Sequence, residues 1–182
     1  MIKEKADAWQ MELTEITWQY EKILEDFDLT ITTLNVKPSP EQWSPMEIVH
    51  HLILVNTSYF PIFDQIILQR YKSPMIGKLP FYGSKMGNII LASMNKSSKI
   101  KTFNSWKPSD KLHNNDLKIK FFTQQDLLSN YLQKLEPFLG KNLMISSPAN
   151  KWIVYPLDSA IDIILAHEKR HLSQIKNILK NI

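Results

Sequence analysis

The chain has 182 residues, which suits a single domain spanning residues 1–182 with its own hydrophobic core. Hydrophobic residues make up 43% and charged residues 22% of the chain, as is ordinary for a soluble globular protein. Cysteine is absent, which excludes disulfide bonds and thiolate metal ligands, and fits a cytoplasmic protein.

The formal net charge of +4 is spread along the chain without a recognisable nucleic-acid-binding motif, so we expect no nucleic-acid partner. The N-terminal segment is charged and periodic and lacks the apolar core of a signal peptide. The most apolar stretch, residues 52–68, contains Asn56, Pro61 and Asp64. It therefore predicts a buried helix, and no membrane partner is expected.

The first predicted helix covers residues 3–34, where apolar residues recur at steps of three and four. Prolines then break the pattern. The second helix has a clear start, with Ser44 as N-cap, Pro45 at the first helical position and Glu47 completing a capping box. His51 falls on the apolar face of this helix. Pro61 lies inside the pattern and should kink or interrupt it.

Residues 72–122 have weaker signals, with a short helix expected near 85–94. A connection of this length either lines a functional site or crosses over between helices of a bundle. The third long helix is predicted from Thr123 to about Leu139, with Gly140 as its stop. The last begins near residues 156–158 and runs almost to the end. Four amphipathic segments and little strand signal predict an all-α fold, a four-helix bundle with a long crossover connection between helices 2 and 3.

Two histidines, His167 and His171, replace apolar residues on the inward face of the last helix. At a spacing of four residues their Cβ atoms lie about 5–6 Å apart, so both rings can reach one metal ion. His51, inward on the second helix, is the best third ligand. The alternative is a set of core histidines with satisfied hydrogen bonds, and the residues alone leave both readings open.

The segment from His167 to His171 also fits the H-E-x-x-H pattern of zinc proteases, in which the Glu activates a metal-bound water. The extended form of that motif is missing, and Lys169 and Arg170 indicate a solvent-facing side. We therefore expect Glu168 to be a surface residue. Gln174, one turn after His171, either holds a ligand by a hydrogen bond or is an ordinary boundary residue.

Five aromatic residues near segment ends could wall a substrate pocket or simply close the core: Trp43, Phe81, Trp106, Trp152 and Tyr155. His50, adjacent to His51, should point about 100° away from it.

Two runs of the sequence resemble signatures of DinB-like proteins. Residues 43–52 match the pattern W-S-x-x-E-x-x-x-H-L, and residues 167–175 match H-x-x-x-H-x-x-Q-I. The resemblance implies a four-helix bundle and one divalent metal ion, zinc or nickel first and iron, manganese or copper next. It implies His51, His167 and His171 as the ligands, and a homodimer.

Relatives of this kind include thiol-dependent S-transferases, a thiol-dependent isomerase and proteins assigned as metal-dependent hydrolases. The leading hypothesis is therefore a metal-dependent enzyme that adds a low-molecular-weight thiol to a small-molecule electrophile. The alternatives are metal-dependent hydrolysis of an amide or ester, with metal-bound water as the nucleophile and Glu168 as the candidate base, and a non-catalytic metal-binding protein.

Overall fold

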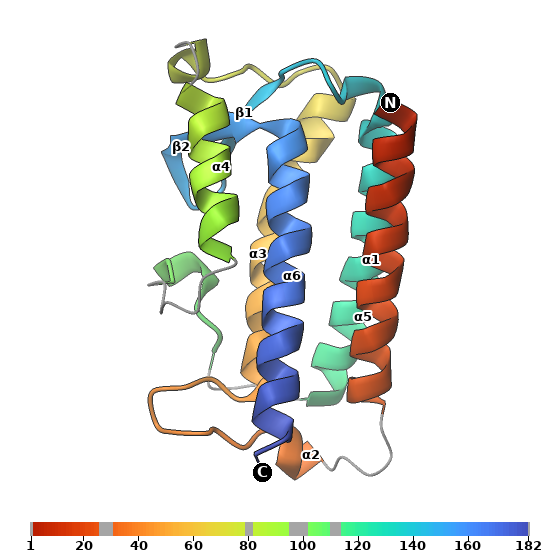
Figure 1. Cartoon of the computed structure of the whole chain (residues 1–182), viewed down its shortest axis with the longest axis vertical. Helices are drawn as coiled ribbons and strands as arrows, with labels where there is room; N and C mark the ends of the chain where they lie inside the picture. Colours follow the sequence, from red (N-terminus) through yellow and green to blue (C-terminus); the bar gives the residue numbers. More distant parts are fainter. Residues whose placement is uncertain (1, 26–30, 79–81, 95–101, 110–113, 182) are drawn as a thin grey trace.

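The computed structural model describes residues 2–25, 31–78, 82–94, 102–109 and 114–181. Four long helices lie side by side along the longest axis (Figure 1): α1 (Ile2–Leu24), α3 (Pro45–Ile67), α5 (Asn114–Leu135) and α6 (Leu157–Leu179). Helix α3 packs against α5 and α6, and α1 packs against the same two helices. The predicted four-helix bundle is therefore confirmed.

Shorter elements complete the fold: α2 (Ile31–Leu34), η1 (Met75–Lys78), α4 (Tyr82–Met94), η2 (Asn104–Trp106), η3 (Glu136–Phe138), β1 (Met144–Ser147) and β2 (Asn150–Pro156). Of these, η1, η2 and η3 are 3₁₀ turns.

The predicted crossover is the connection between α3 and α5, which contains η1, α4 and η2. Helix α4 packs along α6 and β2, so it forms an additional layer beside the bundle (Figure 1). Gly87 permits the close approach of α4 to α6, because a Cβ atom at this position would lie 2.9 Å from the Cβ atom of Ser159. The crossover thus lies against the helix that carries two of the candidate ligands.

Several predicted boundaries were wrong. Helix α1 ends at Leu24, and only the short α2 is helical between residues 31 and 34; residues 26–30 lie outside the described part. Helix α3 continues through Pro61, which lies on its exposed side. Helix α5 begins at Asn114 rather than Thr123, because the buried Leu117 and Phe121 extend its apolar face.

A two-stranded antiparallel hairpin, which the sequence reading did not predict, connects the end of α5 to α6. Ile145 and Tyr155, which are paired across the hairpin, are buried in the hydrophobic core on its inner face. Directly after the hairpin, the backbone N–H of Leu157 donates to the carbonyl of Leu143 at 2.8 Å. The hairpin therefore sets the position at which α6 enters the bundle.

Gly140 has a left-handed backbone (φ 67°), as expected for a residue that ends a helical segment. Across the described ranges we find no helix with both the length and the apolar character needed to cross a membrane.

Candidate metal centre

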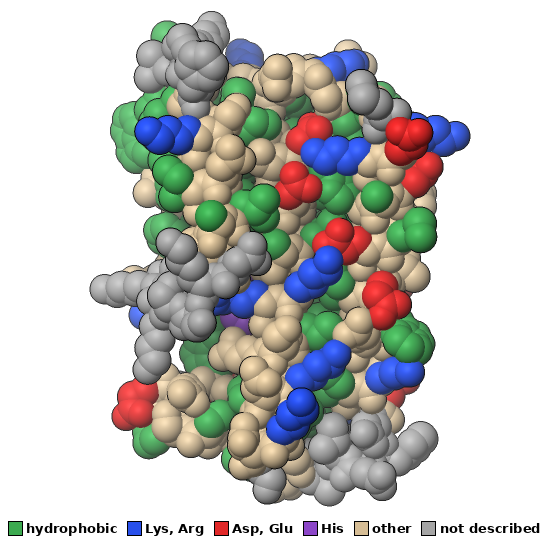
Figure 2. Space-filling model, viewed as in Figure 1, with side chains coloured by type: hydrophobic (Ala, Val, Ile, Leu, Met, Phe, Trp, Pro, Cys, Tyr) green, Lys and Arg blue, Asp and Glu red, His purple; other side chains and the backbone are tan. Residues whose placement is uncertain are grey.

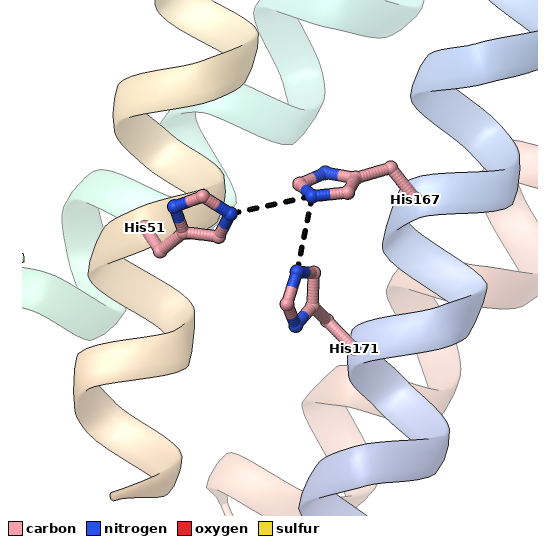
Figure 3. A group of neighbouring side chains, drawn as sticks. All are labelled: His51, His167 and His171. Atoms are coloured by element: carbon pink, nitrogen blue, oxygen red, sulfur yellow. Dashed lines mark hydrogen bonds between the residues drawn. The ribbon is translucent and has the colours of Figure 1, made fainter. Parts of the chain in front are cut away.

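His51 is placed by the start of α3. The hydroxyl oxygen of Ser44 accepts from the N–H of Glu47 at 3.2 Å, and the Glu47 carboxylate accepts from the N–H of Ser44 at 2.8 Å. This capping box, predicted from the sequence, fixes the first turn and hence the direction of each later side chain. His51 lies two turns further on, buried, and its ring points toward α6 (Figure 3).

His167 and His171 extend from successive turns of α6 toward His51 (Figure 3). The Nε2 atom of His167 lies 3.2 Å from Nε2 of His51 and 3.0 Å from Nε2 of His171. One nitrogen of each ring lies within 4.8 Å of the other two. The three histidines selected from the sequence thus come together in one cluster between two helices.

Two of the three nitrogen–nitrogen separations fit a shared metal ion. Metal–nitrogen bonds of 2.0–2.1 Å place two ligand nitrogens about 3.3 Å apart at a tetrahedral angle and about 2.9 Å apart at a right angle. The observed 3.2 and 3.0 Å lie between these values. Among the described residues, no further His, Asp or Glu joins the group. The donor set therefore leaves a coordination position open, as catalytic metal sites do.

Hydrogen bonds on the far side of two rings orient the cluster. Nδ1 of His51 lies 2.7 Å from the backbone carbonyl oxygen of Trp106 in η2. Because a carbonyl only accepts, this nitrogen must donate, which leaves a free lone pair on Nε2. Nδ1 of His171 lies 3.0 Å from Oε1 of Gln174. Gln174 thus holds a candidate ligand by a hydrogen bond. This is the first of the two roles, ligand support or ordinary boundary residue, that the sequence left open.

Burial keeps the cluster neutral. It lowers the pKa of His51 and His167, and it lowers the pKa of His171 to about 3. The mutual repulsion of the rings when charged acts in the same direction for His167 and His171. Neutral imidazole is the form that binds metal, so protons compete weakly for this site near neutral pH. Nδ1 of His167 is buried and has no hydrogen-bond partner among the described residues.

The surroundings of the cluster are aromatic on one side. The ring centroid of Trp43 lies 4.9 Å from that of His51, and Trp106 in η2 lies against α3, with its indole N–H donating to the Ser58 hydroxyl at 3.2 Å. On the other side, Nη1 of Arg170 donates to the carbonyl of Met94 at 3.0 Å, joining α6 to the end of α4. A histidine side chain is visible in a hollow on the face shown in Figure 2.

The remaining candidate aromatics lie elsewhere. Trp152 is 64% exposed on the hairpin. Tyr155 belongs to the core, where its hydroxyl lies 2.7 Å from that of Tyr59. Phe81 lies outside the described residues. His50 does not join the cluster; its Nδ1 accepts from the N–H of Ser109 at 3.2 Å.

The prediction that Glu168 is a surface residue was wrong. Its side chain is fully buried, and its carboxylate accepts from Nδ2 of Asn56 on α3 at 2.5 Å and from Nε2 of Gln125 on α5 at 2.9 Å. It is not a member of the histidine group. Burial raises the pKa of Glu168 to about 7, although both amide hydrogen bonds act in the opposite direction. The sequence reading missed this buried polar network.

Comparisons with known proteins agree with the fold and with the family that the sequence resembles. The sequence model of the DinB superfamily matches residues 14–175. A solved structure of YfiT from Bacillus subtilis, described as "a probable metal-dependent hydrolase with an unusual four-helix bundle topology", is similar with a TM-score of 0.64. The two chains are 16% identical, and the similarity covers 98% of this chain and 88% of that chain. No curated protein matches this sequence.

Proposed function

Because this chain belongs to the DinB superfamily and three of its imidazole rings converge, we propose that His51, His167 and His171 bind one divalent metal ion at the active site of an enzyme. The convergence of three Nε2 atoms, without a fourth ligand from the described residues, is the observation that carries the proposal. Imidazole ligands suit zinc, nickel, copper and iron alike. The resemblance to DinB-like proteins puts zinc and nickel first, and iron, manganese or copper next.

The reaction that we favour is the transfer of a low-molecular-weight thiol to an electrophilic small molecule. A bound divalent metal would lower the pKa of a thiol at its open position. The sulfur forms a bond to the electrophilic carbon, the leaving group departs with its electron pair, and the thiol proton passes to solvent. The chain itself holds the ligand rings through Trp106 and Gln174 and provides the indole of Trp43 beside His51.

Metal-dependent hydrolysis is the second candidate, because the similar YfiT is described as a probable hydrolase of this kind. This reaction needs a base or a strongly acidified water. Glu168, the base suggested by the sequence motif, is sealed between Asn56 and Gln125. Since no carboxylate of the described residues belongs to the histidine group, we place thiol transfer, which does not depend on such a base, before hydrolysis. A non-catalytic metal-binding role remains the third candidate.

The first experiment is elemental analysis of protein purified without a metal-affinity tag. We expect about one equivalent of a divalent metal in the parent and almost none in His171→Ala, with helix content retained because the bundle has its own apolar core. The matched control is His50→Ala, which removes a histidine of α3 that lies outside the cluster. A parent that stays empty after reconstitution with zinc or nickel would refute the metal site.

The second experiment separates the reactions. Parent, chelator-treated parent and His171→Ala are assayed with glutathione or cysteine and a chloronitrobenzene electrophile, and separately with nitrophenyl esters. Metal-dependent release of chloride that requires thiol supports transfer. Ester cleavage without thiol supports hydrolysis, and inactivity of the metal-loaded parent in both assays supports a binding protein. The homodimer and the cytoplasmic location remain predictions.

A further inference from the structure

Glu168 lies on the buried face of α6, which also includes His171. Ile164 and Leu165 precede it by four and three residues, and Leu172 follows it by four, so all three share its side of the helix. His167 leaves the helix about 100° away from Glu168. The carboxylate therefore points to the middle of the bundle, while the adjacent ring points to α3 at its side.

The turn that contains Glu168 is hydrogen-bonded to all three of the other long helices. The carboxylate accepts from Asn56 on α3 and from Gln125 on α5. The backbone carbonyl of Glu168 accepts from the hydroxyl of Tyr20 on α1 at 2.9 Å. Asn56 lies five residues after His51 on the same helix. The network thus joins the two ligand-bearing helices at the level of the cluster.

The network is costly as a purely structural feature. Asn56 Oδ1, Gln124 Nε2 and Gln125 Oε1 are buried without hydrogen-bond partners among the described residues. A buried polar group lowers stability when it is left unsatisfied. Apolar side chains of similar volume often replace a buried charged group without loss of stability. Stability alone therefore does not account for the presence of a carboxylate here.

Geometry provides a reason. Side-chain tips lie about 5–6 Å from a helix axis, so a rotation of α6 by about 20° would move His167 and His171 by about 2 Å. Metal sites tolerate deviations of about 0.2 Å. The hydrophobic effect is non-directional and by itself sets no particular rotation of the helix. Hydrogen bonds are directional, and those of Glu168 hold the same helical turn from which the two histidine rings extend.

We propose that Glu168 is a positioning residue, whose hydrogen bonds to Asn56 and Gln125 fix the rotation of α6 against α3 and so hold His167 and His171 in ligand geometry toward His51 (Figure 3). The inference rests on the proposed metal site. It assigns to Glu168 no contact with substrate or metal, unlike the general-base role that the H-E-x-x-H pattern predicts.

The test uses cobalt(II), whose absorption spectrum reports the number and geometry of its ligands. Glu168→Met keeps the volume but removes the hydrogen bonds. We expect this variant to bind cobalt about 10- to 100-fold more weakly than the parent, the range found when groups that orient metal ligands are removed. We also expect its visible absorption bands to change. Glu168→Gln, which keeps one acceptor oxygen, should restore part of the affinity.

A matched control separates positioning from general loss of stability. Phe63→Leu removes core volume on α3, in a contact with Tyr59 and Tyr131 that is outside the network. We expect Phe63→Leu to lower the unfolding free energy but to leave the cobalt spectrum and affinity unchanged. If Glu168→Met does not fold, Gln125→Met, which removes only the α5 bond, takes its place, with a smaller loss of affinity expected.

A parent that binds no cobalt would refute the metal site itself. A parent that binds cobalt, beside a folded Glu168→Met or Gln125→Met variant with the same spectrum and an affinity within about twofold, would refute the positioning role alone. The same loss of affinity in Phe63→Leu would also refute it, because destabilisation would then explain the effect.

Discussion

Lowering the pH should destabilise the metal-free protein through its buried histidines. His171 has a pKa of about 3 in the folded state against 6.5 as its ordinary value. Between these two values the unfolded chain binds a proton that the folded chain does not, so stability is lost as the pH falls below about 6.5. At pH 5, about 1.5 pH units lower, His171 alone should cost about 2 kcal/mol.

Other buried groups also change how the unfolding free energy depends on pH. The lowered pKa values of His51 and His167 act in the same direction as that of His171. Glu168 acts in the opposite direction, because its pKa is raised from 4.5 to about 7 and the folded state therefore binds the proton more tightly. Between pH 7 and pH 5 this contributes about 2 kcal/mol of stabilisation, roughly the effect of one histidine. The unfolding free energy therefore still decreases as the pH falls.

The assay is urea unfolding of chelator-treated protein, followed by tryptophan fluorescence at pH 7 and pH 5. Replacing His171 with Gln removes one titrating ring, so the loss of unfolding free energy between the two pH values should shrink by about 2 kcal/mol. His50→Gln is the control for removing a histidine of α3 outside the cluster; because burial lowers the pKa of His50 too, it should also reduce the difference. An unchanged pH dependence in His171→Gln would refute the reasoning that burial keeps this ring neutral.

Three further predictions concern stability. Ser44→Ala should lower the unfolding free energy by about 0.5–2 kcal/mol in urea unfolding, because the N–H of Glu47 loses its side-chain acceptor; no loss would show that the cap is not used in solution. Gly87→Ala should cost about 1–3 kcal/mol by forcing α4 away from α6, and the double variant with Ser159→Gly should recover most of it. Zinc at about 100 times its dissociation constant should raise the unfolding free energy of the parent by about 2.7 kcal/mol, and an equal rise in His51→Gln would contradict the ligand assignment.

The histidine cluster could be predicted from the sequence because each step depends on local rules. The capping box at Ser44 fixes where α3 begins, and helical periodicity then places His51 on the inner face. Residues four apart on one helix must be neighbours, which brings His167 and His171 together. Only the meeting of α3 and α6 required information beyond local sequence, and the resemblance to DinB-like proteins provided it.

The start of α5 and the hairpin were missed because tertiary partners decide them. Gln124 and Gln125 are buried on α5, although polar residues at the start of a segment are typical of an exposed helix end. The acceptor that explains the burial of Gln125 is Glu168, which is 43 residues away in the sequence. Similarly, strand β1 is only four residues long and depends on β2 and on packing beneath it.

Glu168 is different, because the sequence contained a signal for its burial. The prediction took the line of the two histidines as the centre of the buried face of the helix. Glu168 was therefore expected on the same side as the solvent-facing Lys169. The apolar residues Ile164, Leu165 and Leu172 instead centre that face on Glu168. The side chains of this motif have different partners: the two histidine rings group with His51, whereas the carboxylate of Glu168 is bonded to Asn56 and Gln125. In H-E-x-x-H zinc proteases the histidines bind the zinc ion and the glutamate acts on its bound water, but here the same residues divide between a histidine cluster and the hydrogen bonds that hold the helices around it.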